Sequence, residues 1–429
     1  MQVMLSLLLW LLPLACTALP QSTAPSTTYP LTPVALPGLP DNSTGIKVHG
    51  IAIGALPDWS HENPRDINAA LGRSISIIGD YLNVSPNDYS LSQVDYHLPS
   101  VVRLARESAR PVYAPALLYG ASLDTWTTEM TDAVADKMLR INQQGVTVWL
   151  RFCFEMNGSW MQYGLDPDAF KKVWIEVTNA IRAKTSDTYM LWAPNIWTGD
   201  VGDATQGYLP YWPGEDYVDL AGLSFYSLGY LKSENQPAAS DLLQRSFTSF
   251  HTLFSPSSAS QNRLGLTRSP PLCIAETSAP FYYELPSSSP YYDQEGDTDI
   301  AGPLPNLTLG EYKPSLMSPP AEHGDDELYL KASWFVQLTS NATATRFPRL
   351  KAVSLFNYLK RGGDETNQAN EVLVDFRATS GNQTVENWFR GYMGNQTAYE
   401  MGYTGTAASR RASAVVASLA LLIAVGLLC

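Results

Sequence analysis

Residues 146–160, VTVWLRFCFEMNGSW, narrow the possible folds of this chain more than any other stretch. The stretch begins as an apolar, β-branched and aromatic run, which is typical of a strand buried on both faces. It ends at Glu155, and Gly158 follows shortly afterwards. With two-residue alternation, Arg151, Cys153 and Glu155 would share one face of the strand. A carboxylate at the carboxyl end of a buried strand is where α/β barrels place their chemistry.

Arg151 and Glu155 each have an ordinary interpretation as well as a functional one. A buried guanidinium is costly unless it is paired, so Arg151 is either a site residue or part of a satisfied core ion pair. Glu155 taken alone could be a surface glutamate at a strand end. A second buried run, residues 271–276 with the sequence PLCIAE, also closes on a glutamate, Glu276. This repetition favours the functional interpretation of both glutamates.

Buried, strand-like runs recur along most of the chain, separated by helical patterns. The eight runs cover residues 46–54, 74–81, 111–118, 146–155, 190–197, 217–226, 271–276 and 350–358. One helix is predicted over residues 101–110. A second is predicted from an apolar stripe made by Met130, Val134, Met138 and Ile141. A third follows the Asp166 cap and Pro167, and its buried stripe is Phe170, Trp174, Val177 and Ile181. This alternation predicts an α/β fold, the (β/α)8 TIM barrel. A doubly wound open sheet is the alternative, but no glycine-rich phosphate loop follows the first strand.

Both ends of the chain look like targeting signals. Residues 1–18 read as a signal peptide with cleavage after Ala18. Residues 19–45, rich in Pro, Ser and Thr, are predicted to be an extended linker before a catalytic domain over residues 46–393. Small residues and a spacer over 394–411, followed by an apolar tail over 412–429, match a glycolipid (GPI) anchor signal. A single membrane-spanning helix is the alternative, although the basic pair Arg410-Arg411 precedes the tail instead of following it.

Composition limits the class of partner. The chain has 429 residues, 45% of them hydrophobic, and a formal net charge of −13 with pI about 4.8. Such acidity argues against nucleic acid and anionic membrane surfaces as partners. We expect a secreted, extracellular monomer held at the membrane or cell wall through its anchor. Without the terminal signals only Cys153 and Cys273 remain, and both are predicted to be buried free thiols.

A secreted chain can be N-glycosylated, and this chain contains several N-glycosylation sequons. They begin at Asn42, Asn83, Asn157, Asn306, Asn341, Asn382 and Asn395. The sequon at Asn157 lies two residues from Glu155, where a glycan would obstruct an active site. We therefore expect Asn157 to remain unmodified.

Glu155 and Glu276 close the fourth and seventh predicted strands. Hydrolysis of a glycosidic bond with retention needs one carboxyl group to protonate the leaving oxygen and a second to attack the anomeric carbon. The two groups stand roughly 5–5.5 Å apart across the sugar. Two strand ends that face each other across a barrel mouth can provide this arrangement.

Several short motifs strengthen that interpretation when they are taken in order. They are RFCFEMNGSW (151–160) with YG (163–164), LWAPN (191–195), YWPGEDYVD (211–219), GLSFY (222–226) and IAE (274–276). The ordered set resembles glycoside hydrolase family 26, the β-mannanase and mixed-linkage glucanase family. The resemblance implies that Glu155 is the acid/base, Glu276 the nucleophile, Tyr226 a hydrogen-bond partner of the nucleophile and Trp160 a sugar-stacking face. Phe154 departs from the family pattern, which has histidine there, and this affects subsite contacts and the pKa of the acid/base.

Other candidate substrate-binding residues lie near the predicted strand ends. They are His49, Arg151, Asn157, Trp192, Asn195, Trp197 and Asn357. His49 is the one histidine expected at the mouth, and Trp197 is the best sugar platform after Trp160, whereas Trp192 could equally be core. The five histidines lack metal-ligand spacing and no G-x-S-x-G elbow occurs. We expect no metal and no cofactor.

A long insertion separates Glu276 from the next predicted helix. Residues 279–324 contain Phe281-Tyr-Tyr283 and many prolines and glycines, which argue against an independent packed core. We hypothesise an aromatic lid over the cleft, with Tyr282 and Tyr283 in contact with sugar; a glycosylated flap that only shields the rim is the alternative.

The function expected from the sequence is retaining hydrolysis of a β-linked polysaccharide, mannan or β-glucan. Two alternatives remain open. A cell-wall transglycosylase would use the same two glutamates but pass the glycosyl group to a sugar acceptor. A catalytically inactive barrel that binds carbohydrate would account for the divergent Phe154.

Overall fold

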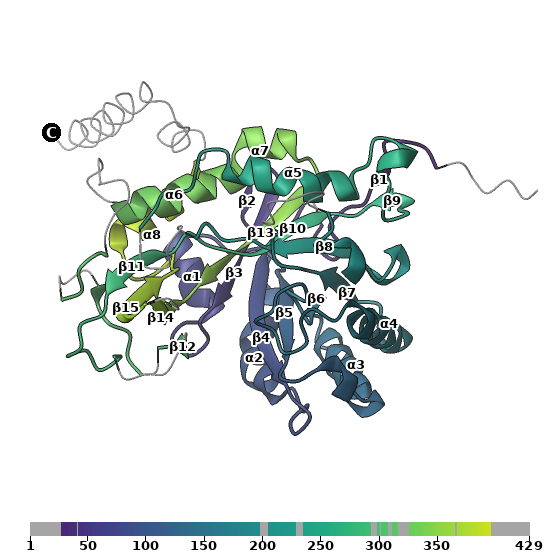
Figure 1. Ribbon diagram of the computed structural model, residues 1–429, viewed down its shortest axis with the longest axis horizontal. Coiled ribbons are helices and arrows are strands. Elements are labelled where there is room, and N and C mark those ends of the chain that lie inside the picture. The colour runs from purple at the N-terminus through teal and green to yellow at the C-terminus, as the bar shows by residue number, and fades with distance from the viewer. Residues whose placement is uncertain are drawn as a thin grey trace, which may run out of the picture.

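Eight parallel strands form a closed barrel at the centre of the molecule (Figure 1). The computed structural model describes residues 27–40, 42–197, 205–228, 235–292, 298–300, 302–307, 311–315, 326–364 and 367–395. The barrel strands are β3 (Ile51–Pro57), β4 (Ile77–Val84), β5 (Val112–Tyr119), β6 (Val148–Phe152), β7 (Thr188–Trp192), β8 (Leu220–Ser224), β10 (Leu272–Thr277) and β13 (Leu350–Asn357). Parallel pairing of β13 with β3 closes the ring. The predicted (β/α)8 fold is confirmed, with one barrel strand for each predicted run.

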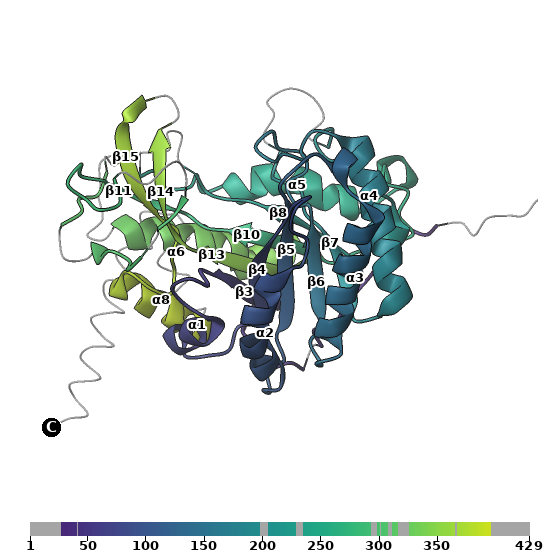
Figure 2. The same ribbon diagram turned by 90° about the horizontal axis from the view of Figure 1, so that it is seen from below.

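Helices surround the barrel on its outer side (Figures 1 and 2). They are α1 (Pro64–Leu71), α2 (Ser92–Ala105), α3 (Thr128–Asn142), α4 (Pro167–Lys184), α5 (Leu242–Phe254), α6 (Asp326–Thr339), α7 (Asn341–Arg346) and α8 (Gln383–Gly394). Short 3-10 turns are η1 (Leu123–Thr125), η2 (Leu209–Tyr211), η3 (Glu215–Tyr217) and η4 (Ala259–Gln261). The stripes predicted for α3 and α4 are buried, and the Asp166 carboxylate accepts from Ala169 N as expected of an N-cap.

One helix boundary predicted from the sequence is wrong. Helix α2 begins at Ser92, nine residues before the predicted start at Val101, and it contains Pro99. Proline removes a backbone hydrogen bond from a helix interior. Here the continuous buried stripe of Val94, Leu98 and Val101 extends past Pro99. The packing of that stripe against the barrel outweighs the lost bond.

The described part of the expected linker packs against the barrel. Leu31 and Leu39 are buried, and strand β1 (Thr32–Pro33) pairs with β9 (Arg268–Ser269). The indole of Trp149 donates to the Pro37 carbonyl at 2.9 Å. A short strand, β2 (Lys47–Val48), then forms a hairpin with β3. These contacts place residues 31–39 across the amino end of the barrel, so they are not a free linker.

A second, antiparallel sheet extends from the carboxyl ends of β10 and β13 (Figure 2). Its strand order is β11 (Phe281–Glu284), β15 (Asn367–Asp375), β14 (Leu359–Asp364) and β12 (Thr298–Asp299). It has a hydrophobic core of its own, made by Phe281, Tyr283, Leu285, Ile300, Leu307, Tyr312, Leu330, Leu359 and Leu373. The core is shared with residues outside the insertion, Leu330 of α6, Leu359 of β14 and Leu373 of β15, so it is not an independent core of the insertion. The hairpin β14–β15, distant in sequence, supplies the missing partner surface.

The two tyrosines proposed for a lid are structural residues of this sheet. Tyr283 is buried, and its hydroxyl donates to Glu327 on α6 at 2.7 Å. Tyr282 is buried against Val372 and Val374 of β15. Neither side chain is available to a sugar, so the lid hypothesis is wrong in the form predicted.

Within the described ranges, no helix combines the length and the apolar character needed to cross a membrane. The expected signal peptide and anchor signal fall outside those ranges.

Candidate active site

Strand β6 ends at Phe152, three residues before Glu155. Cys153 and Glu155 both adopt left-handed backbone conformations, with φ of 43° and 54°. Non-glycine residues rarely do so, and such strain gathers at functional sites. Cys153 packs into the outer core, whereas Phe154 joins the cluster inside the barrel. The predicted alternation therefore fails after Phe152, because the left-handed turn reverses the direction of the side chains that follow.

The turn that carries Glu155 is fixed by the neighbouring loop after β7. Glu155 N donates to Ala193 O at 2.8 Å. The buried Asn157 amide bonds Asn195 twice, from its Nδ2 to the Asn195 carbonyl at 2.9 Å and from Asn195 N to its Oδ1 at 2.8 Å. Asn157 is only 8% exposed, so its buried amide leaves little room for a glycan. This geometry supports our expectation that the sequon is unused.

Trp160 folds back over the same turn and contacts the acid/base candidate. Its indole nitrogen donates to Glu155 Oε2 at 2.6 Å, while 61% of its surface remains exposed. A Cβ on Gly158 would lie 2.4 Å from the Trp160 ring. Glycine is therefore required at position 158 for the tryptophan to reach the glutamate.

Glu276 lies near the end of β10, where the pairing with β8 shifts register between Ile274 and Glu276. Such irregularities redirect side chains and are common beside active sites. Arg151 Nη1 donates to Glu276 Oε2 at 2.8 Å, and the Tyr226 hydroxyl donates to Glu276 Oε1. Arg151 Nη2 also donates to Ser224 Oγ at 3.0 Å. Arg151 is thus an ion-paired residue within the site, and Tyr226 makes the contact that the family resemblance implies.

The surroundings of the two glutamates differ in charge. Burial raises the pKa of Glu155 above its ordinary value, and the negative charge of Glu276 raises it further. Hydrogen bonds from Ser224, Trp160 and Asn195 partly oppose this rise in pKa. Glu276 instead accepts hydrogen bonds from a guanidinium and a phenol. The site therefore favours the protonated form of Glu155.

Aromatic side chains from several strand ends gather around Tyr81 and Tyr226, the two tyrosines whose hydroxyls interact with Glu276. The set comprises Tyr81, Phe154, Tyr226, Phe356, Tyr358 and Phe376. The Arg151 guanidinium lies 4.5 Å from the centroid of Phe154. Phe154 therefore covers the cation that pairs with Glu276, at the position where the family pattern has a histidine.

Sequence reasoning missed Ser224 and Tyr81. Ser224 bridges the site, because it contacts both Arg151 and Glu155. Tyr81 lies near the end of β4, and its hydroxyl interacts with Glu276. Tyr81 closes a predicted strand, so the rule that singled out the glutamates would have found it had it been applied to hydroxyl groups. Ser224 lies inside the predicted run 217–226 and closes only the observed strand β8.

Asn357 ends β13, but it is buried and its amide is fully engaged. Its Oδ1 accepts from Ala378 N at 2.7 Å and Thr379 N at 3.3 Å, and its Nδ2 donates to Glu62 at 2.5 Å. The expected substrate contact is therefore wrong for Asn357, which instead joins the loop after β15 to the loop after β3. Burial raises the pKa of Glu62 to about 7, with a further contribution from Asp58.

Two further expectations are corrected. Trp192 is fully buried outside the barrel, where its ring packs on Trp212, Phe250 and Phe254. It is a core residue and not a sugar platform. His49 lies in the turn before β3, at the amino end of the barrel. The mouth is at the opposite end, so His49 cannot line it.

The remaining candidates lie as follows. Trp197 is 39% exposed in the loop after β7, and its ring lies over Gly207 as Trp160 lies over Gly158. Trp160 and Trp197 are thus exposed tryptophans in the loops after adjacent strands. Cys153 and Cys273 are buried free thiols, as predicted.

The molecule is thus a closed (β/α)8 barrel with Glu155 after its fourth strand and Glu276 near the end of its seventh. Residues 122–239 match the family model described as glycosyl hydrolase family 26. The match contains Glu155, Trp160, Asn195 and Tyr226, and it ends before Glu276. Within this segment the chain is therefore similar to glycoside hydrolase family 26.

Individual relatives are distant. Endoglucanase H of Acetivibrio thermocellus is 24% identical over 206 residues, which cover 44% of this chain and 21% of that protein. A family 26 β-mannanase from Bacteroides ovatus is 15% identical, with a TM-score of 0.40, over 57% of this chain and 76% of that one. An endo-β-1,4-mannanase double mutant from Cellulomonas fimi is 14% identical, with a TM-score of 0.48, over 81% of this chain and 71% of that one.

Proposed function

We propose that this chain is a retaining glycoside hydrolase that cleaves a β-linked polysaccharide, a mannan or a β-glucan. Glu155 is the acid/base and Glu276 the nucleophile. The observation that carries the proposal is the contrast between two carboxyl groups in one mouth. One has a raised pKa, and the other is bound by a guanidinium and a phenol. The family 26 match and the names of the relatives support the substrate class.

In the first step, protonated Glu155 donates its proton to the glycosidic oxygen. The Glu276 carboxylate attacks the anomeric carbon as the bond to that oxygen breaks, which forms a glycosyl ester and releases the leaving sugar. In the second step, ionised Glu155 takes a proton from water, and the oxygen of that water attacks the anomeric carbon. Glu276 leaves as a carboxylate. The product keeps the β configuration because two inversions have occurred.

The contacts of the site support this division of roles. Esterification removes the negative charge of Glu276, which is one cause of the raised pKa of Glu155. The pKa of Glu155 then falls, so the same group becomes a base for the second step. Arg151 and Tyr226 stabilise Glu276 both as the attacking carboxylate and as the carboxylate that leaves.

The test uses purified protein on a panel of β-mannans and β-glucans, with product analysis by NMR. We expect β-anomeric products to appear first. Glu155→Gln and Glu276→Gln should each abolish turnover while retaining the thermal unfolding profile of the parent protein. Turnover near the parent rate in either variant would show that the assignment is wrong. A first product of α configuration would exclude retention.

Transfer to a sugar acceptor is a second candidate outcome. Trp160 and Trp197 offer exposed rings on the side of Glu155, where a leaving or accepting sugar would lie. Products longer than the starting oligosaccharide would identify a transglycosylase. Products that are only shorter would identify a hydrolase.

We also propose that the protein acts outside the cell and is held there by a C-terminal glycolipid anchor. The support is the sequence pattern alone. Truncation before Ala414 should convert a retained protein into a released one. Resistance of the full-length protein to a phosphatidylinositol-specific phospholipase would favour a spanning helix instead.

A further inference from the structure

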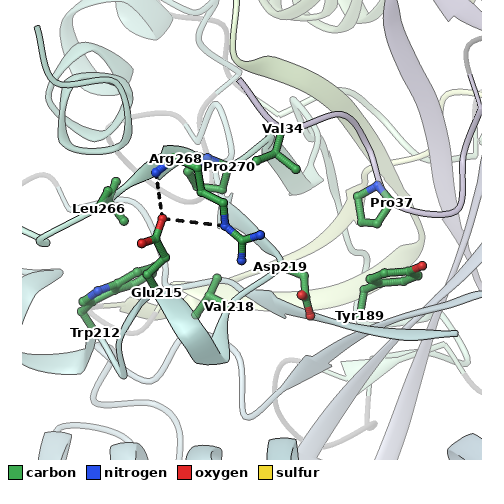
Figure 3. Close-up of a pocket in the computed structure, with 10 residues that line it drawn as sticks. All are labelled: Val34, Pro37, Tyr189, Trp212, Glu215, Val218, Asp219, Leu266, Arg268 and Pro270. Carbon is green, nitrogen blue, oxygen red and sulfur yellow. Dashed lines mark hydrogen bonds and ion pairs between the residues drawn. The ribbon is translucent and has the colours of Figure 1, made fainter. Parts of the chain in front are cut away.

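A second pocket lies at the amino end of the barrel, opposite the mouth (Figure 3). Its walls include Tyr189 at the start of β7, Asp219 before β8 and Pro270 before β10. Pro37 of the N-terminal segment also lines it. Because the strands are parallel, these positions are separated from Glu155 and Glu276 by the length of the barrel.

The pocket is small, and both apolar and charged side chains line it. Its volume is about 160 Å³. Pockets that enclose drug-sized ligands measure roughly 300–1,000 Å³, so this one suits a single ring. Tyr189 and Pro37 line one side, and Trp212 and Leu266 the other (Figure 3). Flat apolar faces of this kind fit the apolar face of a sugar ring.

The acidic walls are held rigid by bonds within the protein. The Glu215 carboxylate accepts from Thr267 N at 2.9 Å, from Thr267 Oγ1 at 2.8 Å and from Arg268 N at 3.0 Å. Asp219 accepts from Met190 N at 2.8 Å and from Arg182 at 3.1 Å. A pocket with fixed walls binds without a large ordering cost.

Arg268 is the donor that these walls leave available. Its Nε lies 3.8 Å from Glu215 Oε1, and about half of its side chain is exposed. Among the described residues, its two Nη atoms have no hydrogen-bond partner. Figure 3 shows the guanidinium directed toward the middle of the pocket. The ring of Tyr189 lines the pocket beside it, and its hydroxyl points away from the middle of the pocket (Figure 3).

We infer that this pocket is a secondary binding site for one neutral sugar unit of a polysaccharide, remote from the catalytic mouth. Arg268 donates hydrogen bonds to the sugar hydroxyls, and the sugar ring lies against the rings of Tyr189, Trp212 and Pro37. The charges favour a neutral ligand: Arg182 balances Asp219 and Arg268 balances Glu215, in a chain of net charge −13. The inference rests on the proposed function for its ligand class. It implies that long chains are held at two places.

The test is affinity electrophoresis in native gels that contain a soluble β-mannan, a β-glucan or an anionic polygalacturonate. Every protein is the full chain with Glu276→Gln, so that the polysaccharide persists. Arg268→Ala and Tyr189→Ala should each raise the dissociation constant for a neutral polysaccharide at least threefold. Arg245→Ala is the matched control, because Arg245 is also exposed and also lies 3.8 Å from an acid, Asp241. It should leave the dissociation constant unchanged.

Further variants distinguish sugar binding at this pocket from sugar binding at the catalytic mouth. Trp160→Ala should weaken retardation independently, and Trp160→Ala with Tyr189→Ala should lose both contributions. In the active protein, Arg268→Ala should leave kcat/KM for a short oligosaccharide unchanged.

The inference is overturned if no neutral polysaccharide retards the parent, or if Arg268→Ala and Tyr189→Ala bind as the parent does. Retardation by polygalacturonate alone would overturn the neutral ligand class. If no substrate is cleaved but retardation still depends on Tyr189 and Arg268, the secondary site stands and the proposed function fails.

Discussion

The indole of Trp160 donates a hydrogen bond to Glu155 at 2.6 Å while most of its ring faces solvent. One side chain thus bonds the group proposed to transfer the proton and also offers a face on which a sugar can lie. Only four residues, Met156 to Ser159, lie between Glu155 and Trp160, so the contact is local in sequence. Its geometry nevertheless depends on Gly158, which leaves room for the ring.

Trp160→Phe should separate these two roles. Phenylalanine keeps an aromatic face but cannot donate, and the lost bond is one that lowers the pKa of Glu155. We therefore expect that pKa to rise and the alkaline limb of the kcat profile to move to higher pH. The check is the pH dependence of kcat on a soluble substrate. Trp197→Phe, which removes no bond to Glu155, should leave the limb in place.

Gly158→Ala should displace Trp160. The new Cβ would lie 2.4 Å from the ring, closer than real contacts allow. Losing a hydrogen bond to a neutral group costs about 0.5–1.5 kcal/mol, so kcat should fall roughly 2- to 10-fold. Gly394→Ala is the control, since an added Cβ there meets nothing within 4 Å. Equal kcat values for the two variants would show that the contact is dispensable.

Tyr226→Phe should lower activity without unfolding the protein. The ring contacts with Phe356 and Phe376, at centroid distances of 5.8 Å, do not need the hydroxyl. The bond to Glu276 does need it, and its loss should reduce kcat/KM by roughly 10- to 150-fold. Steady-state kinetics with parallel thermal unfolding tests this. A large fall in melting temperature would indicate a structural role instead.

Glu62→Gln should alter the pH dependence of stability. In the folded protein the Glu62 pKa is about 7, above its unfolded value near 4.5, so the fold prefers the protonated form. Stability of the parent therefore falls as pH rises from about 4.5 to 7 and levels off above that. Glutamine stays neutral and should be more stable than the parent at pH 8, by up to about 3 kcal/mol, but similar at pH 4. Denaturant unfolding at both pH values measures the difference, with the exposed Glu107→Gln as control.

Tyr283→Phe should destabilise the antiparallel sheet and leave sugar binding unchanged. Its hydroxyl bonds the buried Glu327, which also accepts from Lys331 and Asn382. Removing one of three donors should cost about 1 kcal/mol of unfolding free energy. Tyr96→Phe, on a largely exposed tyrosine, should have no effect. A raised KM for oligosaccharides without a loss of stability would restore the lid hypothesis.

The sequence determined the barrel and the position of its chemistry. Each barrel strand is a continuous buried run, and the glutamates stand out because they follow such runs at 146–155 and 271–276. These are local signals, because the burial pattern, the capping at Asp166 and the strand length each depend on a few neighbouring residues.

Only the tertiary structure decided in which direction the side chains beyond the strand ends point. The left-handed turn at Cys153 directs Phe154 inward, and no periodicity predicts such a turn. Trp192 and Trp197 are similar in sequence terms, but Phe250 and Phe254, far along the chain, bury only Trp192. The Asn357 amide is hydrogen-bonded to Glu62 and Ala378. Tyr282 and Tyr283 pack in the sheet beside β15, and Tyr283 also bonds Glu327 of α6. In each case the partner is remote in sequence, so whether a side chain is free for a sugar depends on long-range packing.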